Sequence, residues 1–361
     1  MAATVTNTST FLPTPVNFVL MKGLLSAARK KLPYFNGTLA GNLQKSGGSA
    51  SVKWERINNL TVATSTLSEL SGTQSAFLGR NFVTPTLSVV TATVLKKGNA
   101  ILVTEEIDLL NVNTKAAKLL DTLGANAGES LNSLMFTAYQ GATNARFSNN
   151  VAGGAASVSF IASAITVGDI KYAVNKLNSN AARTYTAIGM GSTNVGTQPI
   201  RSSFYGICHV DVEEDIRSLT GFVPVEQYAG YTETMPFEFG AVGGVRWSST
   251  QVSTIATSAA TKTATGLRGA STIAHDVYDS FIYGQEAIGT VGLGNMHATN
   301  SYEMYNPKSP PAVELIYKQV GSGGAMDAFN EIGSLAWKAW FVGTILNQGW
   351  LVKIRSGAST L

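Results

Sequence analysis

Alternation of apolar and polar side chains predicts two extended segments in the first third of the chain. After a turn at 46–49, Val52 and Trp54 alternate with charged residues, which is typical of a half-buried strand. Residues 84–107 are rich in Val, Thr, Leu and Ile, and at about 3.3 Å per residue they would span roughly 70 Å if extended throughout. An isolated two-stranded ribbon is marginally stable in water. The pair, joined by a polar tip at about 59–83, must therefore pack on a later domain of the same chain or on a neighbouring copy.

From residue 113 the apolar positions recur every three or four residues, which predicts one long amphipathic helix. Asn113 can cap its start and Gly141 can end it. Gly124 and Gly128 lie inside it and each costs about 1 kcal/mol relative to alanine, so we interpret them as points of close backbone packing. The positions that define the period are Ala116, Leu119, Leu120, Leu123, Ala127, Leu131, Leu134, Met135 and Ala138.

Weaker patterns organise the rest of the chain. Residues 1–45 have no strong period and indicate an extended arm with a short helix near 18–31. A second helix is predicted at 166–180, capped by Thr166, and a strand running into a helix at 204–219. Asp211 and Glu214 have the spacing of a capping box at the start of that helix. The remainder to about 310 is predicted to be short strands with glycine-rich turns.

The stretch 334–354 places three tryptophans close together near the C-terminus. Asn347-Gln348-Gly349 is turn chemistry, and the alternation beyond it favours a buried strand pair. A helix through 335–346 is the main alternative, and an aromatic ligand platform is another. A membrane span is not expected, because it needs about 20 consecutive apolar residues and Lys338, Asn347 and Gln348 interrupt this run.

Composition changes this picture in one respect. The 361 residues are 44% hydrophobic, which suits two or three cores, but only 13% are charged, about half of the roughly 25% usual in soluble domains. Interface centres are depleted in charge, so the deficit indicates a surface covered by other subunits, although secreted β-rich proteins share this bias. The net charge of +4 comes without a basic block longer than Arg29-Lys30-Lys31. We expect no signal peptide, and the single Cys208 excludes an internal disulfide framework.

Candidate catalytic chemistry is sparse. Of the three histidines, His209, His275 and His297, the candidate is His209, which has Cys208 next to it and Asp211 two residues on. On a strand, Cys208 and His209 would point to opposite faces and could form no dyad. His209 and Asp211 would share a face, but two ligands do not make a metal site. The glycine run at 187–196 lacks the third glycine of a dinucleotide fingerprint, and we find no nucleophile elbow, phosphate-binding loop or HExxH motif. We therefore predict no enzyme activity, no catalytic, cofactor-binding or metal-binding residues, and no cofactor.

Several strings, together with the order of the elements, resemble the major capsid proteins of tailed double-stranded DNA phages, in particular a branch found in short-tailed phages. The resemblance covers nearly the whole chain. Val210 and Ala328 depart from it, because relatives often have proline after the corresponding histidine and aspartate. The strings that carry it are Trp54-Glu55-Arg56, CHVDVEEDI at 208–216, FEFGAVGGVRW at 237–247, YDSFIYGQEAIG at 278–289 and DAFNEIGSLAWKAW at 327–340.

The resemblance implies an α+β fold of five segments. Its C-terminal strands would return to a peripheral domain and pack on the long helix, called the spine helix, so that Trp337, Trp340 and Trp350 would be sheet and core residues. The implied segments are an N-terminal arm (1–45), an extended two-stranded loop (46–104), a peripheral domain with the spine helix (105–158), an axial domain (159–310) and the peripheral return strands (311–361).

The resemblance also implies a function and partners. Copies of the chain would assemble into pentamers and hexamers of an icosahedral shell enclosing double-stranded DNA, and the arm and the extended loop would contact neighbouring subunits. Packaged DNA would be touched weakly and without sequence specificity, and portal and decoration proteins are further expected partners. The chain would be made in the host cytoplasm and reside in the virion, with no membrane contact. An encapsulin-like nanocompartment and a secreted β-rich adhesin or carbohydrate-binding protein remain as alternatives.

Overall fold

The computed structural model describes about three fifths of the chain, mostly in continuous stretches, together with a few single positions. The predicted cap Asn113, nearly all of the polar tip, His297 and the glycine run at 187–196 lie outside it. The described residues are 24, 27–28, 31–41, 51–58, 60, 62, 64, 84–105, 115–148, 158, 161, 163–185, 202–228, 235–253, 255–258, 266–269, 275–291, 313–318, 320, 329 and 331–360.

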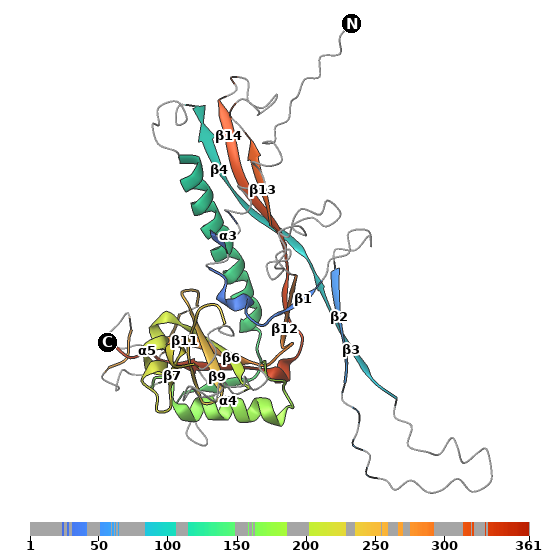
Figure 1. The fold of residues 1–361 in the computed structure, drawn as a ribbon, viewed down its shortest axis with the longest axis vertical. Helices are drawn as coiled ribbons and strands as arrows, with labels where there is room; N and C mark the ends of the chain where they lie inside the picture. The colour runs from blue at the N-terminus through green and yellow to red at the C-terminus, as the bar shows by residue number, and fades with distance from the viewer. Residues whose placement is uncertain are drawn as a thin grey trace, which may run out of the picture.

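A mixed eight-stranded sheet forms the rounded lobe in the lower part of Figure 1. Helices α4 (Val167–Ser179) and α5 (Val210–Arg217) pack on it. Its main path, in spatial order, is β5 (Ala145–Phe147), β16 (Leu351–Ser356), β11 (His275–Tyr283), β6 (Phe204–His209), β9 (Val245–Thr250), β8 (Glu238–Val242) and β7 (Val223–Pro224), with β10 (Ala256–Ser258) paired to β11.

The alternation of side chains along these strands separates two hydrophobic cores. On β6, Phe204 and Cys208 join the core under α4 and α5, whereas Ile207 joins the core on the other side of the sheet. That second core contains helix α3 (Lys115–Gln140) and the short 3-10 helix η1 (Pro33–Phe35). The sheet is therefore covered on both faces. Helix α3 ends at this lobe, where its last residue, Gln140, donates to Asp279 on β11 (Figure 1).

Helix α3 confirms the long helix predicted from the three- and four-residue period, and it ends one residue before Gly141. It runs along a three-stranded antiparallel sheet in the elongated upper part of Figure 1, ordered β13 (Val313–Lys318), β14 (Ile332–Phe341) and β4 (Leu95–Thr104). Residues of β14 alternate between buried and half-buried, and the buried set faces α3. Helix α4 confirms the second predicted helix, with Thr166 and Asp169 forming a capping box.

Two smaller sheets remain, one beside the lobe and one that forms a projecting ribbon. One is β1 (Leu39–Gly41), β12 (Ile288–Val291) and β15 (Gly343–Ile345). The other is the two-stranded ribbon β2 (Ser51–Ile57) and β3 (Leu87–Thr93), which leads away from the lobe in Figure 1. β3 is followed almost at once by β4, with only Val94 between them, so the long extended segment predicted from residue 84 is confirmed as two successive strands with different partners.

The prediction of a strand pair at the C-terminus is correct in strand type and wrong in pairing. β14 pairs with β13 and β4, and β16 pairs with β11 and β5, so the two segments lie in different sheets. The turn at 347–349 opens a 3-10 helix, η8 (Gln348–Trp350), in which Asn347 Oδ1 accepts a hydrogen bond from the Gly349 amide. No helix among the described residues is long and apolar enough to cross a membrane.

Candidate assembly surfaces

The ribbon is anchored at its base by one aromatic side chain. Trp54 is 8% exposed and packs in a small core with Val52, Val94 and Val291. Its indole lies where a Cβ on Gly41 would come within 2.6 Å, so any larger residue there would displace the ring. Two residues further along β2, the Arg56 guanidinium lies 5.5 Å from the centre of the Trp350 ring. The base of the ribbon is thus fixed to the rest of the subunit.

Beyond this anchor the opposite face of the ribbon is exposed and apolar. Ile57 and Leu87 are cross-strand partners and are 68% and 54% exposed, and Val89 on the same face is 44% exposed. Closer to the base, this face carries the exposed ion pair of Lys53 with Glu55. An exposed ion pair of this kind contributes little to stability. The apolar side chains of this face belong to no hydrophobic core of the described residues. We call Ile57, Leu87 and Val89, which share one face of β2 and β3, the outer ribbon face.

The N-terminal segment lies in a groove on the spine helix, formed where Gly124 and Gly128 have no side chain. Leu24, Ala27 and Ala28 are helical and buried, and they lie against Gly124 and Gly128. A Cβ on Gly124 would come within 2.8 Å of the Leu24 carbonyl oxygen, and one on Gly128 within 2.6 Å of that of Ala28. The close backbone packing predicted for these two glycines is therefore confirmed.

Tyrosine hydroxyls then fix the path of the chain after this segment. Tyr139 on α3 donates to the Tyr34 carbonyl, Tyr283 to that of Asn36, and Tyr185 to that of Gly37. Burial is the main cause of the raised pKa of Tyr139, so the phenol remains a neutral donor. These hydrogen bonds hold residues 34–37 between α3 and the eight-stranded sheet.

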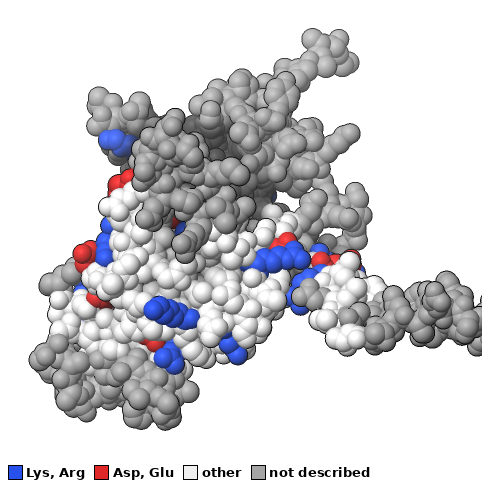
Figure 2. Space-filling view, turned by 60° about the horizontal axis from the view of Figure 1, so that its bottom comes forward, with Lys and Arg blue, Asp and Glu red and all other residues white. Residues whose placement is uncertain are grey.

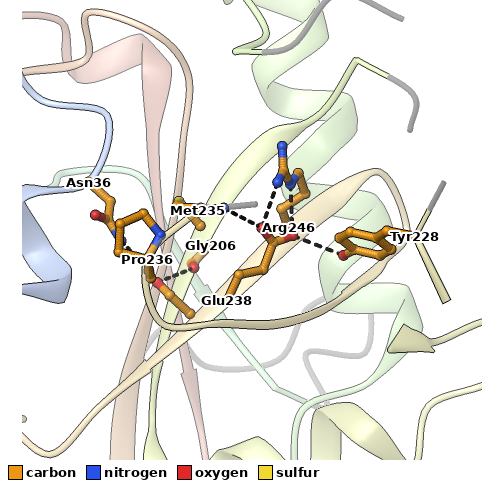
Figure 3. Close-up of polar contacts among 8 residues, drawn as sticks. Asn36, Gly206, Tyr228, Met235, Pro236, Glu238 and Arg246 are labelled. Atoms are coloured by element: carbon orange, nitrogen blue, oxygen red, sulfur yellow. Dashed lines mark hydrogen bonds and ion pairs between the residues drawn. The ribbon is translucent and has the colours of Figure 1, made fainter. Parts of the chain in front are cut away.

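A buried ion pair organises the edge of that sheet where β8 and β9 meet (Figure 3). Glu238 receives two hydrogen bonds from Arg246, of 2.7 and 2.6 Å, and both side chains are at most 1% exposed. The carboxylate also accepts from the Tyr228 hydroxyl and the Met235 amide, each at 2.9 Å. Burial opposes the charge on Arg246, but hydrogen bonding and attraction from Glu238 outweigh it and raise the arginine pKa.

The pairing of Glu238 with Arg246 was not predicted from the sequence. The signal that could have found it is Gly243-Gly244, a two-residue hairpin loop in which both residues have positive φ, of 63° and 84°. Such a loop makes β8 and β9 adjacent antiparallel strands, and this brings Glu238 and Arg246 within reach across the hairpin.

His209 caps a helix. Cys208 and His209 do point to opposite faces of β6: the thiol is fully buried under α4 and α5, and burial raises its pKa. The predicted capping role of Asp211 is wrong. His209 is the N-cap of α5, because its Nδ1 accepts the Asp211 amide at 3.2 Å, and the Asp211 carboxylate pairs instead with Arg268.

Charge is sparse and scattered over the described surface. On the face seen in Figure 2, uncharged residues dominate and charged side chains lie in small separate groups. His275 is buried at the start of β11, far along the chain from His209. In the described part of the chain no three His, Cys, Asp or Glu side chains lie together in a way that could hold a metal ion.

A lobe with a mixed sheet, a spine helix along a three-stranded sheet and a projecting ribbon together define the fold of phage capsid proteins, and comparison of structures shows this likeness directly. The chain is similar to the capsid protein in the structure of the capsid of Ralstonia phage GP4, with a TM-score of 0.61 over 92% of each chain at 10% identity.

Two further solved structures show the same likeness. The head structure of Helicobacter pylori bacteriophage KHP40 matches with a TM-score of 0.54 over 91% of each chain at 11% identity. The Cyanophage Pam1 capsid asymmetric unit matches with a TM-score of 0.51 over 93% of each chain at 11% identity. No family model and no curated protein sequence matches this chain.

Proposed function

We propose that this chain is the major capsid protein of a tailed double-stranded DNA phage and that it assembles into the pentamers and hexamers of an icosahedral shell. The observation that carries the proposal is the match with the Ralstonia phage GP4 capsid over nine tenths of both chains. The match extends over most of both chains, which supports a likeness of the overall arrangement and not of a single element. The role is assembly and not catalysis.

The ribbon supports this proposal on physical grounds. Its base is anchored at Trp54, but its outer face exposes Ile57, Leu87 and Val89 to solvent in the isolated subunit. Removing such apolar area from water yields about 25 cal/mol per Å², and closed symmetry repeats the gain at every equivalent contact. We propose that the ribbon, within the loop segment 46–104, lies across a neighbouring subunit.

The remaining finer assignments are also part of the proposal. Residues 1–45 would be the arm, 105–158 the peripheral domain with the spine helix, 159–310 the axial domain and 311–361 the return strands. The return strands would be divided between two sheets, because β16 pairs with β11 in the sheet of the lobe. Packaged DNA, a portal protein and decoration proteins would be the partners, in a virion assembled in the host cytoplasm.

Assembly of the purified chain tests the proposal. Negative-stain images of the protein should show closed shells, and V89S on the outer ribbon face should reduce shell yield at least several-fold. V210S is a matched control, because Val210 is 43% exposed and Val89 is 44% exposed but Val210 lies on α5. Absence of any shell from the wild-type chain would contradict the proposed function. Shells isolated from their source that contain protein cargo and no DNA would indicate an encapsulin-like compartment instead.

A further inference from the structure

Three described residues other than glycine have left-handed backbone conformations, and two of them have local explanations. Ala181 (φ 51°) follows the end of α4, where the amides of Ala181 and Ala182 bond to the carbonyls of Asn178 and Leu177 as in a Schellman motif. Glu286 (φ 62°) lies in the turn between β11 and β12. Its carboxylate lies 3.8 Å from Arg183, so the side chain has a partner.

The third, Phe237, is a large aromatic residue where turn chemistry favours glycine. Residues 235–238 read Met-Pro-Phe-Glu, and the Glu238 amide bonds to the Met235 carbonyl at 3.1 Å. Proline in second place and φ of 66° in third place are the arrangement of a type II turn, whose third residue is normally Gly or Asn. Bulky residues in this region of φ are outliers. The turn explains the backbone conformation but not the phenyl ring, which is 38% exposed.

The turn that carries this ring is held from both sides (Figure 3). On one side the Glu238 carboxylate accepts the Met235 amide and is itself held by buried Arg246. On the other side Asn36 Nδ2 donates to the Pro236 carbonyl at 2.8 Å. Proline further restricts the backbone. The backbone that carries the Phe237 ring is therefore held in one conformation, so little conformational entropy would be lost if another surface covered the ring.

We infer that Phe237 is an anchor residue through which the subunit docks on a second copy of this chain. This inference rests on the proposed function. Aromatic residues held rigidly are enriched at the centres of interfaces, and strained backbone persists where it serves a function. The cluster that holds the turn exposes no charge, because Glu238 and Arg246 neutralise one another inside the protein.

A second copy fits this surface better than nucleic acid does. Binding to DNA depends on exposed Lys and Arg that neutralise phosphates, and the arginine of this cluster is buried in an ion pair. A copy of this chain, of which only 13% is charged, offers the neutral surface that an exposed phenyl ring requires.

Three variants test the inference. F237N places a residue suited to left-handed φ in the turn and removes the ring, F237L keeps an apolar side chain, and A181G relaxes a left-handed residue at an exposed position on α4's end. The concentration at which shells form should rise about tenfold for F237N, a typical loss for an interface anchor. It should stay within about threefold for F237L and remain unchanged for A181G.

Subunit stability is the second measurement. In F237N, relief of the backbone conformation and loss of the ring's contacts within the chain oppose one another, so the melting temperature of the unassembled subunit should change by no more than about 3 °C. If F237N forms shells at the wild-type concentration, or if its assembly falls only in parallel with a larger loss in melting temperature, the inference is overturned while the proposed function stands. If the wild-type chain forms no shells, both fail.

Discussion

At the glycine groove on the spine helix, helix propensity and steric contact predict opposite signs for the change in unfolding free energy on substitution by alanine. Alanine in place of Gly128 should gain about 1 kcal/mol from helix propensity. The new Cβ would come within 2.6 Å of the Ala28 carbonyl oxygen and 3.1 Å of the Ala28 Cα, which are backbone atoms that no rotamer change can move. Overpacking of this kind costs about 1 to 3 kcal/mol. We therefore expect G128A to destabilise the subunit by up to about 2 kcal/mol, because the steric cost exceeds the gain.

If the N-terminal segment instead leaves the groove, the cost has another origin of similar size. Leu24 is fully buried there, and burial of a leucine side chain is worth about 1.5 to 3 kcal/mol. Detachment would also break the exposed ion pair of Lys31 with Glu129, which contributes little. The two routes are distinguished by limited trypsin digestion, because only detachment makes the bond after Lys31 rapidly cleavable.

Urea unfolding of the unassembled subunit measures the effect, and G168A is the matched control. Gly168 also lies in a helix, α4, but the nearest heavy atom to its added Cβ would be Thr166 Oγ1 at 3.6 Å, an ordinary contact. G168A should therefore stabilise by up to about 1 kcal/mol. A G128A subunit that is as stable as G168A and equally resistant to trypsin would refute the role assigned to the groove.

Two further predictions concern single side chains. W337A should lower the free energy of unfolding by about 3 to 5 kcal/mol in urea and yield insoluble subunit, because Trp337 is 3% exposed and donates a hydrogen bond to Asn126 Oδ1. W340A changes the half-buried face of β14 and should cost less, so equal losses for the two variants would contradict the distinction. Burial lowers the pKa of His209 from 6.5, so the unfolded chain binds the proton more readily and the free energy of unfolding should fall as the pH drops through about 6.5. H209N should keep the helix cap and reduce that pH dependence. A melting-temperature profile from pH 5 to 7.5 that is the same for H209N and the wild type would argue against this role of His209.

Local periodicity predicted those elements whose formation depends on local contacts. The spine helix, α4, the strand running into α5 and the ribbon strand with Trp54 were all visible in the spacing of apolar residues. The period marks which face of an element is buried, and this depends only on neighbours within a few positions. The two helix glycines belong to the same class, because an unfavourable residue inside a strong period signals a steric requirement.

Local periodicity could not predict which strands pair with one another. β14 pairs with β4 from Ile332 opposite Thr104 to Phe341 opposite Leu95, and nothing in either period selects the other across that separation. The cap at α5 was missed for a chemical reason: aspartate is a common N-cap and histidine is not, yet His209 Nδ1 takes the amide and leaves the Asp211 carboxylate to Arg268. Phe237 could not have been recognised either, since its left-handed conformation follows from a turn that the sequence alone leaves unspecified.

The C-terminal segment explains why so much apolar surface lies near the end of the chain. Between Ile332 and Ser356 the chain contributes β14 to the sheet along the spine helix, β15 to the sheet beside the ribbon anchor and β16 to the eight-stranded sheet of the lobe. Trp337 and Trp350 are buried in the core that these parts share. One continuous segment therefore links three sheets, and Trp337 on β14 and Trp350 just before β16 join two of these sheets to one core.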